Sequence, residues 1–204
     1  MPALWSGFET AMNSWFCGDA EGGDVTTDGS ETAKKIADEY DKAIKTSAGP
    51  QNNIYANGLQ KALIENGFST SFNAQMAAAG TPPEGMDMQV PVWVAAATGV
   101  VNSWATATFQ AMPATGHGLA TLPLTTGPTD HALLDPGLAG IMPLAKAIYD
   151  AFHTEDCAQV AGILVGGFED HMKLINGLYS GMMPNPAGTP PLIPQPPVPW
   201  VGVS

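Results

Sequence analysis

The chain has 204 residues, of which 45% are hydrophobic and 13% are charged, which suits one globular domain with an appendage and excludes disorder throughout. Nineteen acidic residues face only seven basic ones, all lysines, and the formal net charge is −12. An acidic chain without arginine cannot build the basic patch that nucleic-acid phosphates require, so we expect no nucleic-acid partner.

Amphipathic periodicity predicts helices in the N-terminal part of the chain. Residues 3–16 place apolar side chains on one stripe, and residues 31–47 repeat this pattern with a charged opposite face. On that charged face, Lys34 with Asp38 and Asp38 with Lys42 have the i,i+4 spacing of helical ion pairs. Each such pair stabilises a helix by only a few tenths of a kcal/mol, roughly, so the apolar stripes carry the prediction.

The segment between these helices, residues 18–30, is rich in glycine and acidic residues. Its carboxylates are Asp19, Glu21, Asp24 and Asp28. Carboxylate oxygens are calcium ligands, but the spacing differs from that of an EF-hand loop. We therefore expect a solvated loop, and a calcium site remains the alternative.

Two features bear on the cellular compartment. The first residues lack the basic region of a secretory signal and carry Glu9 within the apolar run. Cys17 and Cys157 are too few for a disulfide scaffold, so we expect two reduced, buried thiols in a protein made in the cytoplasm.

Two more helices are expected before the middle of the chain. Residues 51–65 carry apolar side chains at helical spacing, and Gly67 is predicted to end this helix as its C′ residue. A short helix follows to Ala79, and the Gly- and Pro-containing stretch 80–87 breaks the chain there.

The central segment is apolar on nearly every side. We predict a helix over residues 91–111, buried in the middle of the domain. Residues 90–109 are long enough to span a membrane, but they contain hydroxyl and amide side chains and lack flanking basic residues. We expect no membrane partner, with a transmembrane helix as the alternative.

Residues 113–137 are rich in Gly, Pro and Thr and form a long loop. Short strands at 119–125 and 131–134 would make it a small β-hairpin; the alternative is an ordered loop. Helical periodicity returns over residues 138–153 and 155–182. The last helix carries small residues at i,i+4 spacing, which predicts the close approach of another backbone. They are Ala158, Gly162 and Gly166.

The sequence carries no catalytic signature: it has no nucleophile elbow, P-loop, dinucleotide fingerprint or zinc-protease motif. Its histidines do not lie at metal-ligand spacing on one helix. They are His117, His131, His153 and His171. Glu169, Asp170 and His171 resemble an acid–base cluster, but adjacent helical residues diverge by about 100° and cannot meet at one substrate. We expect no catalytic, cofactor-binding or metal-binding residue, and a chain that is not an enzyme.

The C-terminal residues 184–204 form a proline-rich arm that follows a helical domain of residues 1–183. Proline fixes φ and lacks an N–H, so the arm is expected to be extended, at about 3.1 Å per residue. An arm of this length can cross its own domain or reach a neighbouring subunit. The residues expected to make its contacts are Pro191, Ile193, Pro197, Val198, Trp200 and Val201.

Four stretches together resemble a type of small virion structural protein of tailed bacteriophages. They are ALWSGFETAMNSWF (3–16), AKKIADEYDKAI (33–44), VPVWVAAATGVVNSWATATF (90–109) and the C-terminal GLYSGMMPNPAGTPPLIPQPPVPWVGVS (177–204). The resemblance covers an alanine-rich helical body and a proline-rich end with the pattern P-x-W-x-G. It implies a structural role in a capsid, neck, tail or baseplate.

The expected fold class is therefore mainly α: a bundle-like helical domain with a long loop and an extended arm. The expected function is that of a non-enzymatic structural subunit of a virion, which docks through its arm on identical or other structural subunits and acts as an oligomer. The leading alternative is a small-molecule-binding or enzymatic helical domain, with a pocket near Trp93, Trp104 and His117.

Overall fold

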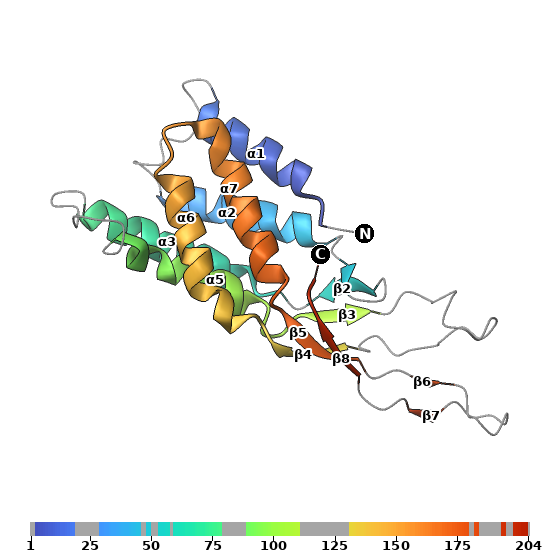
Figure 1. The fold of residues 1–204 in the computed structure, drawn as a ribbon. Coiled ribbons are helices and arrows are strands. Elements are labelled where there is room, and N and C mark those ends of the chain that lie inside the picture. Colours follow the sequence, from blue (N-terminus) through green and yellow to red (C-terminus); the bar gives the residue numbers. More distant parts are fainter. Residues whose placement is uncertain are drawn as a thin grey trace.

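Helices dominate the fold (Figure 1). The computed structural model describes residues 3–18, 29–45, 48–49, 53–57, 59–78, 89–110, 131–179, 182–183, 193–194 and 198–203. The α-helices in these ranges are α1 (Trp5–Cys17), α2 (Gly29–Ile44), α3 (Lys61–Ala78), α5 (Val94–Ser103), α6 (Ile141–Phe152) and α7 (Cys157–Met172). Short 3-10 turns, η2 (Val90–Trp93) and η3 (Leu138–Gly140), lead into α5 and α6. The predicted mainly α fold class is confirmed.

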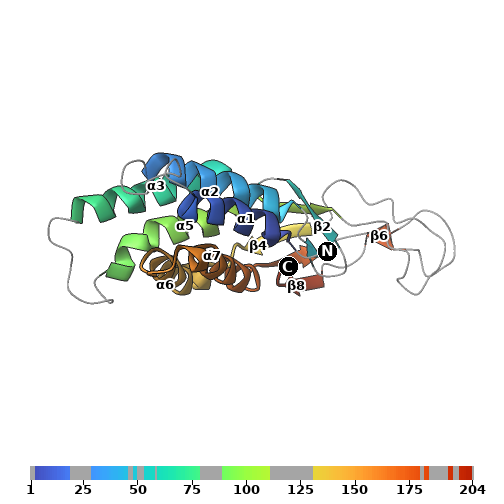
Figure 2. The ribbon, with the colours of Figure 1, turned by 90° about the horizontal axis from the view of Figure 1, so that it is seen from above.

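A six-stranded antiparallel sheet lies at one end of the helical body (Figures 1 and 2). Its order is β1-β2-β3-β4-β5-β8, so β1 and β8 form its edges. The strands are β1 (Ala48–Gly49), β2 (Asn53–Asn57), β3 (Thr108–Gln110), β4 (His131–Asp135), β5 (Asn176–Tyr179) and β8 (Val198–Val201). A separate two-stranded ribbon, β6 (Met182–Met183) with β7 (Ile193–Pro194), lies farther from the helices.

The helices pack their apolar faces into one core. On α2, Ile36, Tyr40 and Ile44 recur at four-residue spacing and are fully buried, as the amphipathic pattern requires. The Tyr40 ring meets Phe168 of α7 edge-on, with 4.8 Å between ring centroids. Its hydroxyl accepts a hydrogen bond from the buried indole nitrogen of Trp104, at 2.8 Å. The polar tips of two core aromatics are thus satisfied inside the core.

The prediction for residues 51–65 is wrong at both ends. Its first half is strand β2, and the helix that follows, α3, continues through Gly67 to Ala78. Gly67 lies inside the helix and does not end it. It faces Gly99 of α5, where the two helices cross closely. A side chain at either position would strike the backbone of the other helix.

The predicted helix over residues 91–111 is too long. α5 ends at Ser103, whose carbonyl accepts a hydrogen bond from the Gln60 N–H at 2.9 Å, at the start of α3. The chain then enters β3. The expected burial is confirmed for Val100, Val101 and Trp104. Within the described ranges, no helix combines the length and apolar character that crossing a membrane requires.

The C-terminal helices are bounded differently from the prediction. η3 and α6 confirm the helix over 138–153, whereas the helix predicted over 155–182 ends at Met172. The Met172 carbonyl accepts a hydrogen bond from the N–H of Val203 at 2.9 Å. After Met172 the chain continues into β5. At its start, α7 is capped by the Asp156 carboxylate.

The row of small residues on α7 does not receive another backbone from the described part of the chain. Ala158, Gly162 and Gly166 are exposed, and a Cβ built on either glycine meets nothing within 4 Å. The close contact lies at the neighbouring Gly167, where a Cβ would stand 2.7 Å from that of Ala147 on α6.

A disulfide joins Cys17, at the end of α1, to Cys157, at the start of α7. The expectation of two reduced, buried thiols is wrong, since both residues are exposed and paired. The pairing follows from helix packing, because Phe8 of α1 lies edge-on against Phe168 of α7, with ring centroids 5.7 Å apart. This contact sets the two helices side by side.

The residues of the predicted ion pairs on α2 bind other partners. Asp38 binds Lys61 of α3, with 2.5 Å between Oδ1 and Nζ, while Lys42 binds Glu39 at 2.6 Å. The hydrogen bond from Lys61 is the main cause that lowers the pKa of Asp38. Asp38 therefore links two helices, whereas the predicted pairs with Lys34 and Lys42 would have stayed within one.

Two loop predictions fall largely outside the described residues. The strand expected at 131–134 is present as β4, whereas 111–130 lie outside, including the strand expected at 119–125. Of the acidic loop 18–30, residues 19–28 lie outside, and so does the expected calcium site.

Candidate functional site

The last residues of the chain dock on its own body. β8 pairs with β5 along its whole length. Beyond β8, Gly202 turns the chain with φ +87°, and its N–H donates to the Ile175 carbonyl at 2.7 Å. The side chain of Val203 is then buried, with 3% of its surface exposed. Residues 198–203 therefore belong to the sheet of the helical body.

The expected interaction residues lie in different places. Pro191 and Pro197 lie outside the described residues, Ile193 lies in β7, and Val198, Trp200 and Val201 lie in β8. The side chain of Val201 is 70% exposed, on a strand whose outer edge has no partner strand in the described part of the chain. Pro199 lies in the same strand, and proline is typical of edge strands because it lacks an N–H.

Exposed apolar side chains gather on the elements that join the helices to this side of the sheet. We call them the junction residues: Leu134, Leu138, Met142, Leu174 and Val201. They come from β4, η3, α6, the link between α7 and β5, and β8, which lie together in Figure 1. Exposed apolar residues that lie together as one patch are typical of protein contact surfaces, whereas single ones are common on any protein.

His171 anchors the end of α7 to the turn after β4. Its Nε2–H donates to the Pro136 carbonyl at 2.7 Å, and its ring lies against Gly137 and Gly140. Gly137 has φ +84°, so a glycine is required there both for its backbone and for its contact with the ring. Burial lowers the pKa of His171, while the hydrogen bond and the charge of Asp135 oppose that shift.

The acid–base cluster does not converge, as predicted. His171 is buried, whereas Glu169 and Asp170 are exposed, and Asp170 pairs with Lys173 at 2.6 Å. Among the described residues, no three His, Cys, Asp or Glu side chains are grouped in a way that could hold a metal ion.

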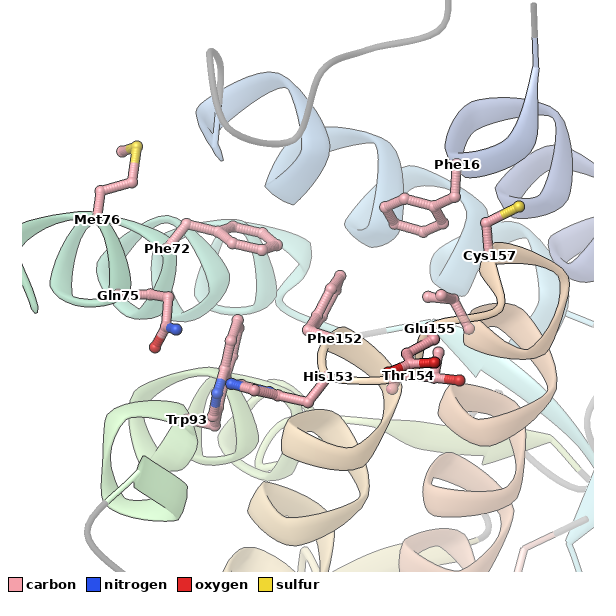
Figure 3. Close-up of a pocket in the computed structure, with 12 residues that line it drawn as sticks. Phe16, Phe72, Gln75, Met76, Trp93, Phe152, His153, Thr154, Glu155 and Cys157 are labelled. Atoms are coloured by element: carbon pink, nitrogen blue, oxygen red, sulfur yellow. The ribbon is translucent and has the colours of Figure 1, made fainter. Parts of the chain in front are cut away.

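A pocket of about 660 Å³ opens at the end of the helical body that is remote from the sheet (Figure 3). Four helices end or begin there: α1, α3, α6 and α7. Its lining residues include Phe16, Phe72, Gln75, Met76, Trp93, Ala151, Phe152, His153, Thr154, Glu155, Cys157 and Val160. Phe72, Trp93 and Phe152 contact one another through their rings.

The pocket corresponds in part to the alternative predicted from the sequence. Trp93 lines it, whereas Trp104 lies in the core beside Tyr40, and His117 lies outside the described residues. Phe152, the last residue of α6, and His153, which follows it, were not identified from the sequence. Aromatic residues at a helix terminus gave no signal that could identify a cavity wall.

Comparison of the chain with protein-family models, with curated proteins and with solved structures gave no match.

Proposed function

We propose that this chain is a non-enzymatic structural subunit of a large assembly, and that the assembly is a tailed-phage virion. The proposed role as a structural subunit rests on the exposed junction residues beside the edge strand β8. An edge strand presents unpaired backbone groups to another chain, and exposed apolar neighbours add area that is buried on contact.

The low charge of the chain supports the same role. Only 13% of its residues are charged, and interface cores are depleted of charged residues. The virion assignment is carried by the sequence resemblance of the four stretches, above all the proline-rich end with P-x-W-x-G. In this proposal the protein is made in the host cytoplasm and contacts identical or other structural subunits.

Sedimentation of the full chain over a range of concentrations tests the contact surface. We expect oligomers that Val201→Asp dissociates, because the new carboxylate would have to be desolvated in the contact. Ala158→Asp is the matched control, because it adds the same charge at an exposed position near the start of α7, away from the junction residues. If both variants and the unchanged chain sediment as the same monomer, contacts between identical subunits through the junction are excluded.

Mass spectrometry of purified particles tests the virion assignment separately. The chain should be recovered from intact particles at a constant ratio to their other proteins. Its recovery only from the soluble fraction of infected cells would contradict the assignment.

The alternative function, a small-molecule-binding domain, is favoured by one observation. The pocket beside Trp93 has the volume of a ligand site, and it lies at the opposite end of the body from the junction residues.

A further inference from the structure

The pocket at the remote end of the helices has a definite chemical character. We propose that it binds a small, uncharged aromatic molecule that carries a hydrogen-bond acceptor such as a ketone. Its volume of about 660 Å³ lies within the range of roughly 300–1,000 Å³ typical of small-molecule sites. The proposal does not depend on the junction residues or on assembly.

The floor of the pocket is built from aromatic rings. Trp93 and Phe152 are stacked, with ring centroids 4.9 Å apart and planes 14° from parallel. Phe72 meets both of them edge-on, at 5.5 Å and 5.1 Å. Phe16, at the end of α1, meets Phe152 edge-on at 5.8 Å. Aromatic rings attract another ring placed edge-on or offset against them, so a flat aromatic guest suits this floor.

The acceptor is required by the indole nitrogen of Trp93. Only 1% of this side chain is exposed, and Nε1 has no hydrogen-bond partner among the described residues. Indole N–H is a donor only, and a buried donor without a partner costs roughly 1–3 kcal/mol, so such groups in proteins are nearly always paired. An acceptor on the guest would supply the missing partner.

His153 controls access to that nitrogen. Figure 3 shows its imidazole beside the indole of Trp93, and the two rings lie edge to face, 6.4 Å apart. His153 is exposed at the end of α6, where its Nδ1–H donates to the Tyr149 carbonyl at 2.8 Å. The imidazole also stacks on the Tyr149 ring, with 4.0 Å between centroids. In this proposal the guest displaces the imidazole into solvent, and the gain from binding must exceed the loss of these two contacts with Tyr149.

The charges of the lining residues exclude an anionic guest. Glu155 supplies a carboxylate at the rim, and the lining residues named above include neither lysine nor arginine. The chain as a whole carries a formal charge of −12. A negatively charged ligand would be repelled by both, whereas an uncharged one is not.

A matched pair of fluorescent probes tests the proposal on the intact protein. The first is 6-propionyl-2-(dimethylamino)naphthalene, which is uncharged and carries a ketone; the second is 2-(dimethylamino)naphthalene, which lacks the ketone. We expect the ketone to bind roughly fivefold more tightly in a fluorescence titration, as one net hydrogen bond provides. The anionic 8-anilinonaphthalene-1-sulfonate should bind more weakly than either.

Trp93→Phe keeps an aromatic ring and removes the N–H. It should abolish the difference between the two naphthalene probes while leaving the affinity for the ketone-free probe nearly unchanged. In the unaltered protein labelled with ¹⁵N-tryptophan, the ketone probe should move the Trp93 indole N–H proton downfield, as a new hydrogen bond does, whereas its analogue should shift that resonance only through its ring current and without this downfield move. This measurement decides the question even if the variant does not fold.

Met76→Ala and Met142→Ala locate the binding site. Both methionines are exposed, but only Met76 lines the pocket. Met76→Ala should weaken binding of both naphthalene probes, and Met142→Ala should not. Equal affinities of the two probes in the unaltered protein, a probe difference that survives Trp93→Phe, or no binding at all would each overturn the proposal.

Discussion

Gly67 of α3 and Gly99 of α5 face one another where their helices cross. A Cβ built on Gly67 would stand 2.5 Å from the carbonyl oxygen of Ala95, and one built on Gly99 would stand 2.3 Å from that of Leu63. Both distances are too short for a real side chain. The crossing is therefore possible only because neither residue has one.

Alanine at either position should destabilise the protein. Gly67→Ala and Gly99→Ala force two backbones apart, which we expect to cost about 1–3 kcal/mol of unfolding free energy in urea. Gly162→Ala is the control, because a Cβ on this exposed glycine of α7 would meet no atom of the described residues within 4 Å. It should stabilise by up to about 1 kcal/mol through helix propensity. Equal effects at Gly67 and Gly162 would contradict the close crossing.

Loss of the Cys17–Cys157 disulfide should lower stability strongly. The bond joins residues 140 positions apart, and a closed loop of that length removes up to about 5 kcal/mol of chain entropy from the unfolded state. We expect urea unfolding of the reduced protein to have a lower midpoint than that of the oxidised protein. The double variant Cys17→Ser/Cys157→Ser should match the reduced form and no longer respond to dithiothreitol. Two titratable thiols in the protein as isolated from an oxidising medium would contradict the pairing.

His171 should make stability depend on pH. Burial lowers its pKa in the folded state below the usual histidine value of about 6.5, so between these two pKa values the unfolded chain binds more protons. Its contribution is complete above about pH 6.5 and is lost as the pH falls through the lowered pKa. His171→Gln should flatten the fall in unfolding free energy between pH 7 and pH 5, relative to the unaltered protein, as measured in urea. The same slope in His171→Gln as in the unaltered protein would contradict this role.

The two valines at the C-terminus should differ in their effects. Val203 is 3% exposed and Val201 is 70% exposed, although they are two residues apart. Val203→Ala should cost about 1–2 kcal/mol through lost burial and should increase hydrogen exchange in β8. Val201→Ala should change neither quantity measurably. Similar exchange in the two variants would show that Val203 does not anchor the strand.

Much of the helical content could be predicted because amphipathic spacing is a local property. The apolar spacing predicted helices at α2 and α6, and the structure confirms both. The burial of the central segment followed from its apolar composition. Helix ends were less predictable, since long-range partners decide them. The Ser103 carbonyl accepts a hydrogen bond from the Gln60 N–H, and the Met172 carbonyl accepts one from the Val203 N–H. Neither partner is visible in the local sequence.

The sheet and the pocket depend on residues that are distant in the chain. β5 lies between β4 and β8, and the aromatic floor combines Phe72, Trp93 and Phe152 from separate helical segments. The sequence predicted Trp93 as a pocket residue, but the prediction that Trp104 lines the same pocket was wrong. Both are buried tryptophans. Only the packing shows that the Trp104 N–H donates to Tyr40, while the Trp93 N–H has no partner in the described part of the chain.

The disulfide also determines how the molecule responds to mechanical force. If the chain is pulled from its two ends, tension passes from Cys17 across the sulfur atoms to Cys157, and residues 18–156 lie outside the covalent path that carries the load. Those residues could be lengthened only after reduction, with a gain of about 480 Å at roughly 3.4 Å per residue. While the disulfide is intact, the bond thus shields α2, α3, α5 and α6 from being drawn out, whereas α1, α7 and the strands β5 to β8 lie on the segments that tension can lengthen.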